Sequence, residues 1–225
     1  MTTTTPSPAP LAQLWSRALT LLRRKKSWQK KDGVYTWQGY GWGIDPPPRT
    51  LAYQYFNYSL IRQAVGERRF QRSLELGCGW GARTPWIAEF SDEPHALEPN
   101  ADVLKDAREW FPGVKFEHAS AQKMPYADSY FGLAVTWTVL QHIPQESIAA
   151  AAEELQRVLT DDGLLLIFEA TGSKRSKPPT FRRTVEEYEA LLPSLRLSQS
   201  IARSSVSGRD EEMQLLCFVG RSDAA

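Results

Sequence analysis

The sequence has few of the residues on which several classes of protein depend. Its 225 residues include only two cysteines, Cys78 and Cys217, and both fall in segments that we expect to be buried. A disulfide framework or a metal cluster is therefore not expected, and no metal site is predicted. A reducing compartment fits this cysteine usage, and the sequence predicts a cytoplasmic protein.

Long apolar runs and a secretory signal are also missing. No stretch approaches the roughly 18 apolar residues that a membrane span needs. The basic cluster at residues 23–26 follows the first apolar stretch, whereas a signal peptide has its charges in front. With 42% hydrophobic and 24% charged residues, the composition is that of a soluble folded protein.

The chain has almost no net excess of charge of either sign, but its charges are unevenly spread. The net charge is +1, yet residues 1–49 carry eight Lys and Arg against two acids, which leaves 19 against 24 for the rest. Residues 1–10 are predicted to be a disordered tail and residues 11–66 a helical and aromatic cap. The basic amphipathic helix expected near residues 11–22 has three interpretations: it packs on the domain, lies on an anionic membrane surface, or is a transit peptide.

Residues 67–225 show the alternating pattern of an α/β domain. Strands are predicted over residues 73–76, 94–97, 114–118, 131–136 and 164–168, and helices over residues 50–65, 82–90, 101–111 and 145–159. A helix over residues 184–192 and two strands over residues 195–202 and 212–219 follow, with no helix between the two strands. This pattern predicts a doubly wound, mostly parallel, seven-stranded sheet with an antiparallel C-terminal hairpin strand. A turn is expected over residues 161–163, and an ordered aromatic loop over residues 32–45.

Three glycines follow the first strand of this domain, at Gly77, Gly79 and Gly81. A glycine-rich turn between a strand and a helix lets the backbone approach a ligand closely. Glu98 closes the next strand, where a carboxylate can accept two hydrogen bonds from a ribose diol. The pair predicts a site for an adenosine-containing cofactor.

Glycine spacing does not decide which cofactor binds, because Gly77, Gly79 and Ala82 also satisfy the nicotinamide fingerprint. Glu75 lies inside the strand, two residues before Gly77. A buried carboxylate there can pair with the ammonium group of a cofactor that has an amino-acid tail, whereas a dinucleotide has no group that needs it. No Tyr-x-x-x-Lys pair and no second domain are present for hydride transfer. Later segments read Met-Pro-Tyr-Ala-Asp-Ser-Tyr-Phe and Val-Leu-Gln-His-Ile. From residue 74 to residue 171 the sequence thereby resembles a class I S-adenosylmethionine-dependent methyltransferase of the small-molecule group, with its Rossmann-like fold.

This resemblance implies S-adenosyl-L-methionine as cofactor and assigns roles to residues at four strand ends. Glu75 and the glycine turn would face the methionine and sugar parts, Glu98 the ribose hydroxyls, and Pro99 the adenine. Serine at position 120 and glycine at position 132 depart from aspartates that are common in the family. The implied cofactor-binding residues are Glu75, Gly77, Cys78, Gly79, Glu98, Pro99, Ser120, Ala121, Gln122, Thr136 and Trp137.

His142 is the candidate catalytic residue. O-methylation requires a base for the acceptor's proton, and a histidine near pKa 6.5 suits this role. The alternative is that His142 ties the loop after the fourth strand together. The sequence lacks the Asn/Asp-Pro-Pro-Tyr/Phe tetrad and the Pro-Cys nucleophile of nucleic-acid methyltransferases, so no nucleic-acid partner is expected.

The expected reaction is methyl transfer to a small molecule, most simply at a hydroxyl oxygen of a sugar, lipid-linked or aromatic acceptor. Basic residues over 172–183, Arg182 and Arg183 among them, would favour an anionic acceptor; the alternative is that they belong to a solvated, flexible loop. The alternatives are an N- or C-methyltransferase and a non-catalytic cofactor-binding partner subunit. Peripheral membrane contact through the basic N-terminal helix is left open, as is the oligomeric state.

Overall fold

The computed structural model describes residues 27–31, 34–38, 48–172, 178–203 and 213–220. Predictions for the N-terminal tail, the basic helix near residues 11–22 and the segment 204–210 therefore lie outside the described residues. So do Tyr40 and Trp42 of the predicted aromatic loop.

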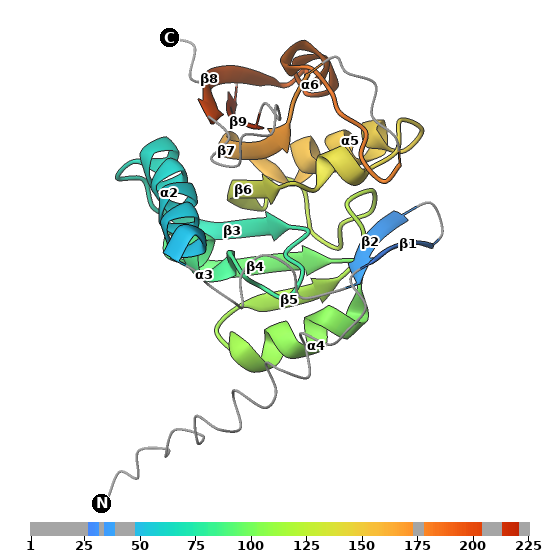
Figure 1. Ribbon diagram of the computed structural model, residues 1–225. Helices are drawn as coiled ribbons and strands as arrows, with labels where there is room; N and C mark the ends of the chain where they lie inside the picture. Colours follow the sequence, from blue (N-terminus) through green and yellow to red (C-terminus); the bar gives the residue numbers. More distant parts are fainter. Residues whose placement is uncertain (1–26, 32–33, 39–47, 173–177, 204–212, 221–225) are drawn as a thin grey trace, which may run out of the picture.

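A seven-stranded sheet organises the described chain, as the sequence predicts (Figure 1). Its order is β5-β4-β3-β6-β7-β9-β8. The strands are β3 (Phe70–Leu76), β4 (Ser91–Glu98), β5 (Lys115–His118), β6 (Phe131–Trp137), β7 (Leu159–Ala170), β8 (Leu195–Arg203) and β9 (Met213–Gly220). The pairs among β3 to β7 are parallel, and β9 runs antiparallel to both β7 and β8. The predicted α/β fold class, with one antiparallel strand from a C-terminal hairpin, is confirmed.

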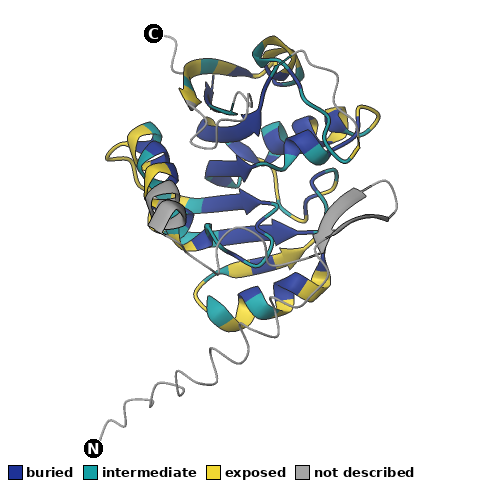
Figure 2. Ribbon diagram, viewed as in Figure 1, coloured by how far each residue is buried: buried dark blue, intermediate teal, exposed yellow. Residues whose placement is uncertain are grey.

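Helices cover both faces of the sheet. Ala96, Glu75 and Val135 lie in one cross-strand row and therefore point to the same face. That face packs against α2 (Pro48–Val65), α3 (Thr84–Ala88) and α4 (Ala101–Trp110). The other face, built on Leu76, Leu97 and Ile167, packs against α5 (Ile148–Val158) and α6 (Val185–Leu191). Burial on both sides explains why the buried positions of the central strands are mostly apolar, and Figure 2 shows these strands at the buried centre of the molecule.

Two predicted boundaries need correction. Helix α3 is shorter than the predicted 82–90, because the glycine-rich turn continues to the N-cap Arg83 and the helix spans only Thr84–Ala88. The turn predicted at residues 161–163 lies inside β7, where the chain between Leu159 and Leu164 bulges opposite Gly132.

A Cβ on Gly132 would come within 2.8 Å of the Phe70 ring, so this position has no room for the aspartate common in the family.

The predicted loop over residues 32–45 is partly a strand. Val34–Gln38 forms β2, which pairs antiparallel with β1 (Ser27–Lys31) in a separate two-stranded sheet. The valine, tyrosine, threonine and tryptophan in β2 have high strand propensity, which outweighed the neighbouring glycines. Figure 1 draws this hairpin on the side toward which β3 and β4 point.

Candidate cofactor and acceptor site

The candidate site lies where the strand order reverses. From β3 the chain moves outward through β4 and β5, then returns to β6 on the other side of β3. In doubly wound sheets, ligands bind at such a switch point, beyond the carboxyl ends of the strands. Here the two loops that meet are the glycine turn after β3 and residues 138–143 after β6.

The glycine turn requires its glycines. Gly77 has φ +71°, and a Cβ there would lie 2.5 Å from Val139 Cγ2, so the two loops are in direct contact. Gly79 has φ +56°, but a Cβ on it would meet no atom within 4 Å, so this side of the turn is open. The N–H groups of Gly77 and Cys78 both donate to Leu97 O, at 2.7 and 3.1 Å. These two amides are therefore used to join β3 to β4, and burial raises the pKa of the Cys78 thiol.

Glu98 connects the glycine turn to the start of α4. Its Oε2 accepts the Gly79 N–H and its Oε1 accepts the Asn100 N–H, each at 3.0 Å. The residue is 8% exposed, and burial raises the pKa of its carboxyl to about 7 although both N–H groups lower it. Each oxygen keeps a second lone pair for a further donor. Pro99 follows directly, and its carbonyl bonds to His118 Nε2 at the end of β5 (3.0 Å).

A second buried carboxylate, Glu75, lies on the same face of the sheet. It accepts a hydrogen bond from the Thr84 hydroxyl, and burial raises its pKa to about 7 while the Arg83 charge lowers it. The Arg83 guanidinium lies 5.1 Å from the centroid of the Trp137 ring, which stacks on Phe168 at 3.9 Å. Arg83 thus points over the end of β6, next to the carboxylate that we expected to face the cofactor's amino-acid tail.

The remaining predicted contacts are more dispersed. Ser120, Ala121 and Gln122 lie on the loop beyond β5, where the Lys123 N–H donates to Ser120 O (3.2 Å). Thr136 is fully buried on the opposite face from Trp137, and its hydroxyl donates to Glu169 Oε1 (3.4 Å). The structure thus gathers Glu75, the glycine turn and Glu98, and turns Thr136 toward a carboxylate that sequence reasoning missed.

That missed residue is Glu169, which is 0% exposed at the end of β7. Its carboxylate accepts the N–H groups of Val139 (2.8 Å), Leu140 (2.9 Å) and Gln141 (3.2 Å). Burial raises its pKa to about 7, and these hydrogen bonds oppose the shift. Its signal in the sequence is an acid directly after a predicted apolar strand, as at Glu98.

His142 lies in the short 3-10 helix η1 (Leu140–His142). The Ala170 N–H donates to Gln141 Oε1 (2.8 Å), so the Gln141 amide group turned toward His142 Nε2 (3.2 Å) is the donor. His142 Nε2 is then an acceptor, and Nδ1 carries the proton and donates to Pro179 O (2.6 Å). Burial lowers the pKa of His142 to about 4, so the imidazole is neutral at pH 7.

Arg183 corrects the interpretation of the basic segment. It is 2% exposed, and its guanidinium donates to Leu140 O (2.9 Å), Ile143 O (2.8 Å) and Phe181 O (3.1 Å). These contacts fix the loop after β6, so Arg183 is not part of a surface for an anionic acceptor. Lys174, Arg175 and Lys177 lie outside the described residues.

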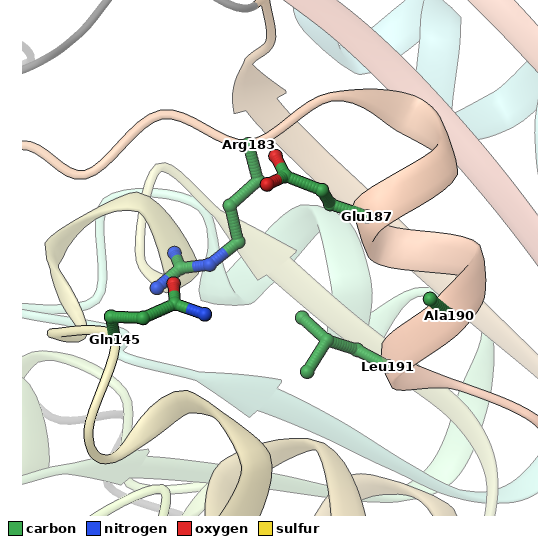
Figure 3. Close-up of a pocket in the computed structure, with 5 residues that line it drawn as sticks. All are labelled: Gln145, Arg183, Glu187, Ala190 and Leu191. Atoms are coloured by element: carbon green, nitrogen blue, oxygen red, sulfur yellow. The ribbon is translucent and has the colours of Figure 1, made fainter.

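A small pocket of about 210 Å³ lies beside Arg183, lined by Gln145, Arg183, Glu187, Ala190 and Leu191 (Figure 3). It shares no residue with the glycine turn and is below the roughly 300 Å³ at which ligand pockets begin. Over the described parts of the chain, no three His, Cys, Asp or Glu side chains are grouped to hold a metal. Within the same parts, no helix is long and apolar enough to cross a membrane.

Comparison with known proteins identifies the domain. Residues 74–163 match a family described as a methyltransferase domain. A malonyl-[acyl-carrier protein] O-methyltransferase from Enterobacter lignolyticus is 32% identical over 98 residues, 44% of this chain and 38% of that protein. A ubiquinone/menaquinone biosynthesis C-methyltransferase from Campylobacter jejuni is 31% identical over 101 residues, 44% of this chain and 41% of that protein.

Among solved structures, the N-methyltransferase NodS from Bradyrhizobium japonicum, in complex with S-adenosyl-L-homocysteine, has a similar fold. Its TM-score is 0.69 at 16% identity, with 92% of this chain and 98% of that chain covered. The chain carries a class I S-adenosylmethionine-dependent methyltransferase domain, and S-adenosylmethionine is the cofactor of this domain. The matches span about half or less of the length of the curated relatives.

The residues at the switch point fit this cofactor. The side of the turn at Gly79 is open, and the Glu98 carboxylate beside it retains acceptor capacity for a diol. The Glu75 carboxylate suits an ammonium group on the cofactor's amino-acid tail.

Proposed function

We propose that the protein transfers a methyl group from S-adenosylmethionine to a hydroxyl oxygen of a small molecule, on a sugar, lipid-linked or aromatic acceptor. The observation that carries the cofactor-binding part of the proposal is the Glu98 carboxylate, which bridges the glycine turn and the start of α4 at the switch point. The His142 imidazole is the observation that favours a hydroxyl acceptor. In this proposal Glu98 binds the ribose diol, and Glu75 faces the amino-acid tail. Pro99 and residues 120–122 border the adenine, and Trp137 lies toward the acceptor.

S-adenosylmethionine supplies a methyl group that its sulfonium already activates, so orientation accounts for most of the protein's contribution. In O-methylation the acceptor's proton leaves as the new C–O bond forms. His142 Nε2, the unprotonated nitrogen of the ring, is the proposed proton acceptor. To act, it exchanges the Gln141 amide donor for the acceptor's hydroxyl.

A second candidate is methylation of nitrogen or carbon, and the state of His142 favours it. A pKa of about 4 makes His142 a weak base, and both ring nitrogens already have partners, Gln141 in the loop and Pro179 beyond it. An amine or an activated carbon needs no such base, and His142 then serves only to hold the loop. The relatives include one O-methyltransferase and one C-methyltransferase by name.

A tritiated-methyl transfer assay tests both candidates. The full chain is incubated with methyl-labelled S-adenosylmethionine and a metabolite extract, alongside His142→Ala, and S-adenosylhomocysteine affinity is measured for each. Labelled product that His142→Ala lowers at least 100-fold at unchanged affinity supports O-methylation with a histidine base. Product that persists in the variant supports nitrogen or carbon methylation. Binding with no labelled product in any extract supports a non-catalytic partner subunit and contradicts the proposed reaction.

A further inference from the structure

Residues 138–143, which follow β6, form a loop whose backbone N–H groups and carbonyl groups are both hydrogen-bonded to side chains from elsewhere in the fold. Glu169 from β7 accepts three successive N–H groups, and Arg183, just before α6, donates to the Leu140 and Ile143 carbonyls. Gln141 adds a bond from its Oε1 to the Ala170 N–H. The loop begins at Thr138, a non-glycine residue with φ +55°, which is a conformation that surrounding contacts must maintain.

The two ends of this loop face different parts of the candidate site. The Val139 side chain occupies the space beside Gly77, which a Cβ on the glycine would need. Three residues later, His142 is oriented by Gln141 and Pro179. A displacement of the amides of residues 139–141 therefore moves both the wall of the glycine turn and the imidazole.

We propose that Glu169 is a positioning residue of this methyltransferase: by gathering three amides of residues 139–141, it sets Val139 against the glycine turn and His142 on the acceptor side. The proposal rests on the proposed function for the role of His142. It assigns Glu169 no contact with cofactor or acceptor, because the carboxylate is fully buried behind the loop.

The chemistry of the contact requires a carboxylate of this length. Three converging N–H donors need acceptors only, and a carboxylate offers about four acceptor positions and no donor. The amide of Glu169→Gln presents one NH₂ group to these donors, so at least one N–H loses its partner. Glu169→Asp keeps the charge but is one methylene shorter, and it cannot reach all three amides.

The experiment uses the chain's small number of histidines. His95, His118 and His142 are the only three, so their ring proton resonances are assigned by single substitutions. Wild type, Glu169→Gln, Glu169→Asp and the control Glu187→Gln are compared at pH 8, above the pKa of about 7 to which burial raises Glu169. Glu187 also accepts one backbone N–H, from Thr184, and glutamine preserves that capping contact. S-adenosylhomocysteine affinity is measured by calorimetry on the same samples.

We expect both Glu169 variants to shift the His142 resonance and leave that of His95 in place. They should also weaken S-adenosylhomocysteine binding about tenfold, because Val139 no longer holds the wall of the glycine turn. Glu187→Gln should change none of these. Folded Glu169 variants with wild-type affinity and an unmoved His142 resonance would overturn the proposal. Failure of the wild type to bind S-adenosylhomocysteine would instead contradict the proposed function, while the histidine resonance would still report the loop.

Discussion

At the scale of single residues, Glu98 is the side chain on which we expect cofactor affinity to depend most. Glu98→Gln keeps the shape but leaves one acceptor oxygen for the Gly79 and Asn100 amides and removes the charge. Each hydrogen bond to a charged group contributes about 1.5–3 kcal/mol, so S-adenosylhomocysteine affinity should fall at least tenfold in calorimetry. Glu93→Gln on the same strand is the control, since Glu93 pairs with Lys115 at the surface. Equal S-adenosylhomocysteine affinities for the two variants would show that Glu98 does not bind the cofactor.

The two glycines of the turn should respond differently to the same methyl group. Gly79→Ala has open space, so it incurs only the left-handed backbone penalty of about 1–2 kcal/mol. Gly77→Ala adds overlap with Val139, and overpacking costs about 1–3 kcal/mol more. Urea unfolding of both variants measures the difference, and a Gly79→Ala that is the less stable of the two would contradict the contact between the loops.

The sequence indicates which charged residues belong to the candidate site more readily than it indicates which groups they contact. Glu75 and Glu98 were found because each stands at a fixed distance from a glycine motif. Glu169 also follows a predicted apolar strand, but its partners are amides about 30 residues away, and no local pattern links the acid to those amides. Arg183 is predicted from the sequence to be a surface charge for the same reason, because its carbonyl partners lie about 40 residues earlier.

At the scale of elements, periodicity predicted the order and type of the strands and helices after residue 48. The errors fall where tertiary contacts decide. The bulge in β7 depends on Gly132 in β6, and the length of α3 depends on how far the glycine turn extends. Neither the bulge nor the helix length can be predicted from the local spacing of hydrophobic residues. The β1–β2 hairpin was missed because its glycine and proline neighbours suggested a loop.

Helix α6 offers a prediction at this scale. It starts with a capping box in which Thr184 and Glu187 bond each other's backbone N–H. Thr184→Ala removes one of the two bonds and should lower the free energy of unfolding by about 1 kcal/mol, whereas Thr184→Ser should restore most of it. Urea denaturation of the three proteins checks this, and a Thr184→Ala variant as stable as wild type would argue against the cap.

At the scale of the whole molecule, buried ionisable groups make stability depend on pH in two opposing ways. Burial raises the pKa values of Glu75, Glu98 and Glu169 to about 7, so their contribution to stability is full at low pH and is lost as pH rises through 7. Burial lowers the pKa values of His95 and His142 to about 4. Their contribution is full above pH 6.5 and is lost as pH falls toward 4.

His95 allows one of these opposing contributions to be measured alone. It is 6% exposed among the rings of Tyr126, Tyr130 and Phe131, and neither ring nitrogen has a hydrogen-bond partner in the described structure. A pKa lowered from 6.5 to about 4 implies that wild type loses about 2 kcal/mol between pH 7.5 and pH 5 through this residue alone. His95→Phe removes only that part, and every other titrating group cancels when the two proteins are compared.

The stability difference between wild type and His95→Phe should therefore shift by about 2 kcal/mol in favour of the variant on going from pH 7.5 to pH 5. Urea unfolding at the two pH values measures it. A difference that is the same at both would mean that His95 titrates in the folded protein as it does in the unfolded chain. In that case water reaches the ring, and the aromatic cluster around β4 is not the closed core that the structure describes.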